Sequence, residues 1–120
     1  MNREQAAVAK LGLGAKQKLL SRLIVRLFSW AHLHGYEIVI EEAYRPKVTA
    51  EYYEKVGKGI ANSLHTKKLA VDISLFRKGV YLTSTEDYRE LGEYWESIGG
   101  TWGGRFNDGG HFSLTHNGVK

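Results

Sequence analysis

The sequence contains no cysteine, which excludes both a disulfide framework and a metal site built on thiolates. Any metal ion would have to be held by histidine, aspartate or glutamate. Proline is almost absent as well, since Pro46 is the only one, and the 42% hydrophobic content is typical of a globular chain rather than a disordered one. A chain of 120 residues can bury one core without covalent staples, so we predict a single domain over residues 1–120.

Long apolar runs and clustered basic residues are also missing. No stretch approaches the ~20 apolar residues of a membrane span, and Met1–Ala7 lacks the apolar core of a secretory signal. We therefore expect synthesis as a soluble cytoplasmic protein without membrane insertion. A net charge of +4 would favour an anionic partner, but the basic residues are scattered along the chain. We expect no nucleic-acid partner, and a charge that mainly maintains solubility.

The hydrophobic pattern predicts a mixture of helices and strands. Apolar residues recur at three- and four-residue steps between Lys16 and Gly35, which predicts a helix packed on the core. Ser84 and Asp87 have the spacing of a capping box, so a second long helix should follow them. The other expected elements are a short helix at 49–56 and strands at 37–41, 69–75, 80–82 and 111–114. A tight turn at Gly79 should pair two of these strands antiparallel, and the fold class we predict is α+β.

The five histidines divide into two groups. Three lie near the end of the first long helix or in a polar tail, where a structural or solvated role is expected: His32, His34 and His116. The other two each accompany a carboxylate at the edge of a predicted strand, His65 with Asp72 and His111 with Asp108. Either pair alone is a weak pattern that chance often supplies.

Asp72 has two interpretations from the sequence alone. It stands inside the apolar run Leu69–Ile73, where an unpaired buried carboxylate would cost several kcal/mol unless a metal or hydrogen bonds compensate it. An alternating strand could equally place Asp72 on its solvent face, with Val71 and Ile73 pointing inward. The pattern does not decide between these two interpretations.

Three short motifs that occur together are far more specific than either histidine–carboxylate pair alone. Ser63-Leu64-His65, then Ala70-Val71-Asp72, then Asp108-Gly109-Gly110-His111-Phe112 resembles the M15 family of zinc peptidases. The resemblance implies a small Hedgehog/DD-peptidase-like fold, an antiparallel sheet with flanking helices. It implies that Zn2+ is bound by His65, Asp72 and His111, and that Asp108 is the general base. It also implies that Arg45 contacts a substrate carbonyl or carboxylate, although a salt bridge to Glu41 or Glu42 is the ordinary alternative.

Two positions depart from the family pattern. Lys68 stands where many relatives have glycine. Either lysine adopts the backbone conformation of that glycine at a steric cost, or the loop near His65 has a different shape in this chain. Asp108 replaces the glutamate common in the family, a recurrent change among phage lysins. Trp102 and Phe106 could line a substrate groove, but large aromatic residues near glycines more often belong to the core of a small domain, so we assign both to the core. Ser63 is expected to cap the loop or to support the site from behind.

The resemblance also implies a substrate, the stem peptide of bacterial peptidoglycan. The bond cut would be L-Ala-D-Glu, by an endopeptidase, or D-Ala-D-Ala, by a carboxypeptidase. The flanking sequence is most similar to phage and prophage members, which implies an endolysin that is made in the host cytoplasm and acts at the cell wall after release. We expect a monomer. The alternative is a non-catalytic wall-binding module that retains the zinc site.

Overall fold

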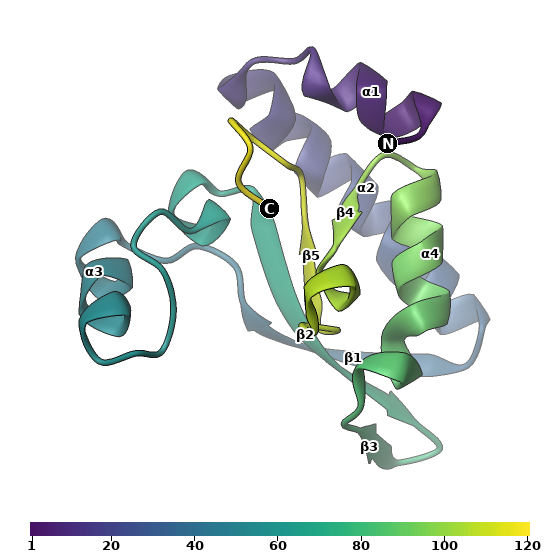
Figure 1. The fold of residues 1–120 in the computed structure, drawn as a ribbon. Coiled ribbons are helices and arrows are strands. Elements are labelled where there is room, and N and C mark those ends of the chain that lie inside the picture. Colours follow the sequence, from purple (N-terminus) through teal and green to yellow (C-terminus); the bar gives the residue numbers. More distant parts are fainter.

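A sheet of five strands organises the chain in the computed structural model, which describes residues 1–120. The strand order is β1-β2-β5-β4, with β3 also paired to β2, and every pairing is antiparallel. The strand bounds are β1 Tyr36–Glu42, β2 Ala70–Arg77, β3 Val80–Leu82, β4 Thr101–Trp102 and β5 His111–Ser113. The predicted α+β class with an antiparallel sheet is confirmed, because β2 is the central strand and helices flank it (Figure 1).

The helices are unevenly distributed about the sheet. Their bounds are α1 Arg3–Ala9, α2 Leu13–Leu33, α3 Lys47–Lys55 and α4 Arg89–Ser97, with short 3-10 turns η1 Leu64–Lys67, η2 Thr85–Tyr88 and η3 Gly103–Phe106. In Figure 1, α1, α2 and α4 gather at one part of the molecule, while α3 stands apart from them beyond β2. None of these helices is long and apolar enough to cross a membrane.

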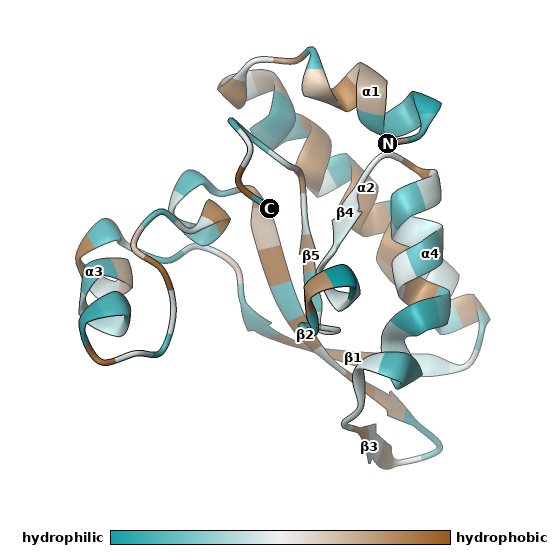
Figure 2. Cartoon of the chain, in the orientation of Figure 1, coloured by the Kyte–Doolittle hydropathy of each residue, from teal (hydrophilic) through white to brown (hydrophobic).

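The main core lies between α2, α4 and one face of the sheet. Alternate residues of β2 join this core, which also holds the apolar stripe of α2 and two aromatic side chains with no exposed surface, Trp95 and Trp102. The β2 members are Val71, Ile73 and Leu75. Since side chains alternate along a strand, Asp72 points to the opposite face. The ribbon of β2 accordingly alternates between hydrophobic and hydrophilic segments in Figure 2.

The sequence predicted the capping box at Ser84 correctly, but it did not predict helix α1. The capping box at Ser84 is present, because its hydroxyl accepts from the Asp87 backbone N–H at 3.3 Å. It opens the 3-10 turn η2, however, and α4 begins only at Arg89. Helix α1 was not predicted; the Asn2 side chain caps it by accepting from the Gln5 backbone N–H at 2.8 Å. A helix of this length has too few apolar positions to show a period.

The contact between α4 and Trp102 yields a stability prediction. A Cβ added at Gly92 would lie 2.1 Å from a ring carbon of Trp102, which is itself fully buried. Gly92→Ala should therefore destabilise the fold by about 1–3 kcal/mol or more through overpacking. Urea unfolding followed by circular dichroism measures this change. Gly14→Ala is the control, since its Cβ would meet nothing within 4 Å and should change stability by at most about 1 kcal/mol, in the favourable direction.

Candidate metal centre

Three neighbouring strands place polar side chains in one row on the face of the sheet away from the main core. Asp72 of β2 lies opposite His111 of β5 and also opposite Glu42 of β1. Residues directly opposite each other in antiparallel strands share a face. The two interpretations of Asp72 are therefore reconciled: it does point away from the core, and that outer face carries a cluster of polar groups.

The place of Glu42 depends on an irregularity that the sequence does not reveal. Ile40 pairs with Ile73, but Glu42 pairs with Asp72, so Glu41 is an extra residue in β1. A β-bulge of this kind redirects the side chains that follow it. It brings the Glu42 carboxylate to 3.9 Å from His65 Nε2, although sequence analysis gave Glu42 no site role.

His65 enters the row from the turn that precedes β2. The Ser63 hydroxyl accepts from the His65 backbone N–H at 3.1 Å and so caps η1, the loop-capping role expected for Ser63. Lys68 ends the turn in the left-handed conformation, with φ +58°. This is the conformation that glycine adopts freely, which accounts for the family's preference for glycine at that position.

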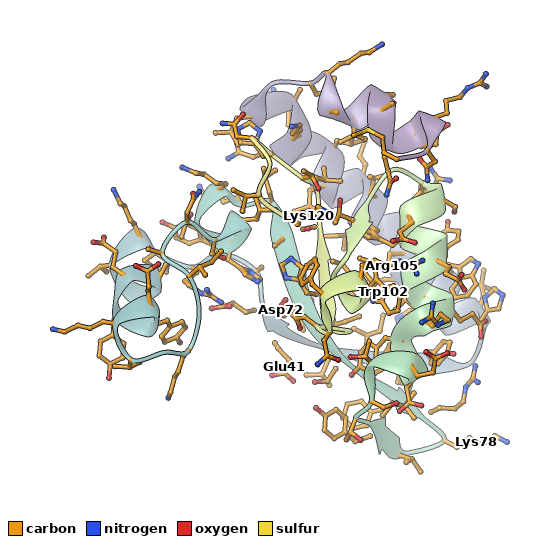
Figure 3. All side chains as sticks on the ribbon, viewed as in Figure 1. Glu41, Asp72, Lys78, Trp102, Arg105 and Lys120 are labelled. Carbon is orange, nitrogen blue, oxygen red and sulfur yellow. The ribbon has the colours of Figure 1, made fainter.

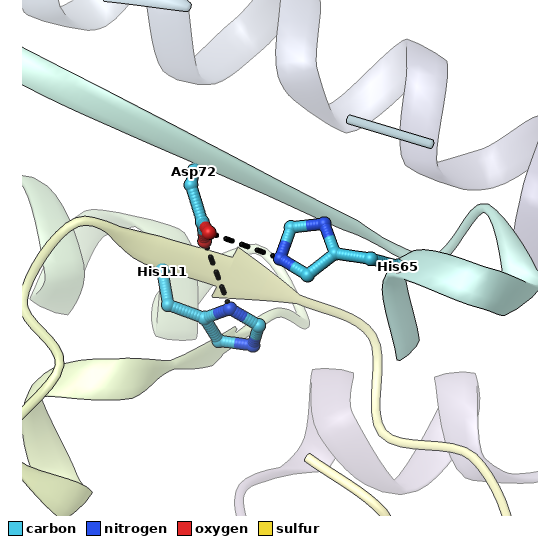
Figure 4. Close-up of side chains that lie close together, drawn as sticks. All are labelled: His65, Asp72 and His111. Carbon is cyan, nitrogen blue, oxygen red and sulfur yellow. Dashed lines mark hydrogen bonds and ion pairs between the residues drawn. The ribbon is translucent and has the colours of Figure 1, made fainter. Parts of the chain in front are cut away.

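The three side chains that the family motif marks converge closely. His65 Nε2 lies 3.1 Å from Asp72 Oδ2, and His111 Nδ1 lies 3.0 Å from Asp72 Oδ1 (Figure 4). One nitrogen or oxygen atom from each of the three lies within 4.8 Å of the others. Both imidazoles are buried, and the Asp72 side chain retains 31% of its exposure. Two imidazoles and one carboxylate at such spacing are donors that could bind a metal ion.

Backbone carbonyls fix which imidazole nitrogen is available to a metal. His65 Nδ1 lies 2.9 Å from the Ala43 carbonyl oxygen, and His111 Nε2 lies 3.0 Å from the Lys120 carbonyl oxygen. A carbonyl can only accept, so these two nitrogens carry hydrogen and donate. The opposite nitrogens, His65 Nε2 and His111 Nδ1, are left to face Asp72. Outer hydrogen bonds of this type orient histidine ligands in metal sites.

The cluster holds charge without a metal. Burial raises the pKa of Asp72, but hydrogen bonds from His111 and His65 lower it more, and the net pKa lies far below its usual range. Burial lowers the pKa of His65, whereas its hydrogen bonds with Asp72 and Ala43 raise it, and the net pKa is raised. A proton on the imidazole therefore stabilises the metal-free cluster, and a bound cation would take its place.

This balance predicts how the metal-free protein responds to pH. His65 has a raised pKa in the folded state, so its contribution is complete below about pH 6.5 and is lost as the pH rises through the folded-state value. Asp72 has a lowered pKa, so its contribution is present above about pH 3.9 and is lost only as the solution becomes strongly acidic. In the presence of a chelator, the unfolding free energy attributable to His65 should fall between pH 6 and pH 8.

Denaturant unfolding of the wild type and of His65→Asn at both pH values isolates this effect, because asparagine does not titrate. The difference in stability between the two proteins should shrink at pH 8. An equal difference at pH 6 and pH 8 would show that His65 does not gain a proton in the folded protein.

An open cavity of about 440 Å³ adjoins the cluster. Arg45 and Asp108, the two further site residues predicted from the sequence, both line it together with the three converging side chains. Asp108 reaches solvent, yet loss of part of its hydration raises its pKa, while His111 lowers it and Asp72 raises it. Lys58 also lines the cavity. The structure thus gathers every predicted site residue around one opening.

Arg45 forms the salt bridge that was its ordinary interpretation, and it also lines the cavity. Its guanidinium forms an ion pair with Glu42, with Nε 3.1 Å from Oε2, so the expected salt bridge exists. The same group lies 5.0 Å above the Tyr53 ring, and the Arg45 backbone N–H donates to the His65 carbonyl. These contacts hold Arg45 at the cavity wall, where it remains in reach of a bound molecule.

Two predictions about residues near the cavity were wrong. Trp102 is fully buried as expected, but Phe106 is 46% exposed, lines the cavity and lies 5.8 Å from the His111 ring centroid to centroid. The turn at Asn107, with φ +63°, redirects the chain just after Phe106. His116 is not simply solvated, because its Nδ1 lies 3.1 Å from the buried Lys16 ammonium. The contact of His116 has no signal in the sequence, because it depends on how two distant segments meet.

Comparisons with known proteins identify a matching family model and similar solved structures. The family model described as D-alanyl-D-alanine carboxypeptidase, of the M15 peptidases, matches residues 56–114, which include the three converging side chains and Asp108. A search of curated proteins found no match. The structure of the Serratia marcescens L-Ala D-Glu endopeptidase ChiX has a TM-score of 0.66 and 23% identity, covering 80% of this chain and 77% of that one.

A second solved structure has the same fold. The D,D-pentapeptidase VanY from a VanB-type vancomycin resistance cassette, a mutant in complex with Zn(II), has a TM-score of 0.58 and 20% identity. The similarity covers 81% of this chain and 71% of VanY. The family match over residues 56–114 and the shared fold together support an M15 zinc peptidase family for this chain.

Proposed function

We propose that this protein is a zinc-dependent peptidase that hydrolyses a peptide bond in the stem peptides of bacterial peptidoglycan. The observation that carries the proposal is the convergence of His65 Nε2, His111 Nδ1 and the Asp72 carboxylate beside an open cavity. The family model and the two structural relatives support it, since they are described as a carboxypeptidase, an L-Ala D-Glu endopeptidase and a D,D-pentapeptidase.

The donor set fits a catalytic zinc ion. Zinc prefers imidazole nitrogen and carboxylate oxygen ligands, and catalytic sites commonly supply three protein ligands and leave one position open. His65 and His111 each donate their other N–H to a carbonyl, and Asp72 lies between them. The cavity on the remaining side would admit water and substrate. VanY, which shares the fold, was solved in complex with Zn(II).

Asp108 is the residue best placed to move protons. Bound zinc would act as a Lewis acid that polarises the scissile carbonyl and makes water more acidic. The Asp108 carboxylate lines the same cavity, so it can accept a proton from the attacking water and return it to the departing amine. In the metal-free protein, partial loss of hydration raises the pKa of the Asp108 carboxyl.

Positive side chains at the cavity favour an anionic peptide. Arg45, Lys58 and Lys120 line it, and a stem peptide carries free carboxylates that such groups would attract. The planar Arg45 guanidinium also suits a carbonyl oxygen that gains negative charge during the reaction. Its pairing with Glu42 holds the guanidinium in place before substrate arrives.

The first test is metal content together with cleavage. The purified protein should bind about one zinc per chain, and cleavage of purified peptidoglycan should stop with a chelator and return with zinc. Zinc at about 100 times its dissociation constant should also raise the unfolding free energy by about 2.7 kcal/mol. Cleavage that persists after complete metal removal would contradict the mechanism.

Mass spectrometry of the released muropeptides decides which bond is cut. Products that separate L-Ala from D-Glu indicate an endopeptidase, and loss of a terminal D-Ala indicates a carboxypeptidase. Zinc binding without any cleavage would favour the alternative of a non-catalytic wall-binding module.

The proposed biological setting extends beyond the chemistry. We propose a phage lysis protein that acts as a monomer at the cell wall after release from the host cytoplasm, on the basis of the resemblance of its flanking sequence to phage lysins. Expression of the protein with and without a holin tests this setting. Host lysis should require the holin, and release of the protein from intact cells without it would contradict the proposal.

A further inference from the structure

Residues 116–120 turn back over the metal cluster. His116 and Val119 exchange two backbone hydrogen bonds, of 3.0 and 2.9 Å, across a turn that contains Asn117 and Gly118 at φ +50° and +77°. The turn brings the Lys120 carbonyl oxygen to 3.0 Å from His111 Nε2. In Figure 3, Lys120 lies above Asp72 in the central part of the molecule.

A buried lysine of α2 anchors this turn. Lys16 is only 4% exposed, and its ammonium lies 3.0 Å from the Thr115 carbonyl oxygen and 3.1 Å from His116 Nδ1. No carboxylate pairs with it. A buried ammonium must find hydrogen-bond acceptors, and each acceptor that Lys16 has belongs to the segment leading into the turn. Loss of the turn would therefore leave a buried charge without part of its compensation.

Apolar packing fixes the other side of the turn. Val119 packs against a small cluster made of Leu64, Leu69 and Ala70. Leu64 directly precedes His65, and Leu69 directly precedes the first residue of β2. The turn therefore has a hydrogen-bonded anchor at 115–116 and an apolar anchor at 119, and the Lys120 carbonyl is held beside His111 by both.

We propose that the 116–120 turn is a positioning element for the metal ligand His111. The Lys120 carbonyl holds hydrogen on Nε2 and sets the ring orientation, so that Nδ1 faces Asp72 and the ion. This inference rests on the proposed zinc site. It adds that the site is incomplete without a backbone group nine residues beyond His111, which no side-chain pattern records.

Removal of Val119 and Lys120 tests the proposal. Outer-shell partners of histidine ligands typically contribute about 10–100-fold to metal affinity. A chain that stops after Gly118 should therefore bind zinc about 10–100-fold more weakly in a chelator competition assay. Circular dichroism of both metal-free proteins checks that the fold is kept.

A spectroscopic measurement separates positioning from general loosening. In the metal-free wild type, the His111 Nε2–H should give a proton signal that exchanges slowly with water, and the same signal should disappear in the shortened chain. The His65 Nδ1–H, which donates to Ala43, should remain protected in both proteins and is the internal reference. Loss of both signals would indicate general loosening and overturn the specific role.

A point substitution keeps the test decisive if the shortened chain fails to fold. Gly118→Val strains the turn, because its φ is +77°, and the added Cβ itself would meet nothing within 4 Å. Gly79→Val is the matched control, with the same φ and the same open space in the β2–β3 turn. Gly118→Val should weaken zinc binding, and Gly79→Val should not.

The outcomes distinguish this inference from the proposed function. No zinc binding by the full chain would defeat the proposed function and this inference with it. Zinc binding by the full chain that is unchanged both in the shortened chain and in Gly118→Val would overturn the positioning role alone.

Discussion

Replacing Asp108 with asparagine should lower the turnover number for muropeptide cleavage by ~10²–10⁴-fold, the usual contribution of a general base. Asparagine keeps the size of the side chain but cannot accept the proton of the attacking water. Asp108 lines the cavity without belonging to the trio of close donor atoms, so Asp108→Asn should bind zinc as tightly as the wild type. Cleavage rates and zinc dissociation constants measured on one preparation give both quantities.

Glu86→Gln is a suitable control for this experiment. It also removes one carboxylate, but its side chain is 72% exposed and pairs with Arg89 on the surface. Turnover should be unchanged in this variant. Near-normal turnover in zinc-loaded Asp108→Asn would remove Asp108 from the mechanism and leave Glu42, whose carboxylate lies 3.9 Å from His65 Nε2, as the next carboxylate to examine.

The candidate site was predictable from sequence to the extent that its geometry is local. Asp72 and His111 stand at fixed positions in two strands, and antiparallel pairing brings them opposite each other. His65 follows from the capped turn just before β2. A motif records such arrangements because the backbone between its members has few alternatives. The family pattern marked Lys68 as a departure with a possible steric cost, and the structure shows what that cost is, a left-handed backbone with φ +58°.

Features that depend on contacts between distant segments were not predictable. Glu42 reaches the site through a bulge, Phe106 through the turn at Asn107, and Lys120 through an anchor on α2. Each arises from tertiary packing that overrides local preference. Elements too short to show a period, α1 and β4, were missed for a different reason, because a period needs several repeats to be visible.

The assignment of two aromatic residues to the core was right for Trp102 and wrong for Phe106. Trp102 and Phe106 both stand among glycines, and the same argument assigned both to the core. Trp102 is enclosed because Gly92 and Gly104 leave room for its ring, each so close that a Cβ would overlap it. Phe106 has no such enclosure and lies at the cavity. The glycines therefore identify the buried residue only when their contacts are known.

The second large effect concerns Asp72, which touches both imidazoles. Loss of a group that hydrogen-bonds to a metal ligand typically weakens metal binding by about 10–100-fold. Asp72→Asn should weaken zinc binding by more than this, because it removes the negative charge of a residue proposed to bind the metal directly. Cleavage should fall below detection at zinc concentrations that saturate the wild type. The two strands that carry Asp72 and His111 are held by backbone hydrogen bonds and by the core beneath them, so the fold should persist.

The measurements for Asp72→Asn parallel those for Asp108→Asn, and the two variants should give opposite patterns. Asp72→Asn should lose zinc affinity and turnover together, whereas Asp108→Asn should lose turnover alone. Excess zinc should restore part of the activity of Asp72→Asn, because the defect lies in binding, and should restore none to Asp108→Asn. Wild-type zinc affinity in folded Asp72→Asn would exclude Asp72 as a ligand and leave its two imidazole hydrogen bonds as a purely structural feature.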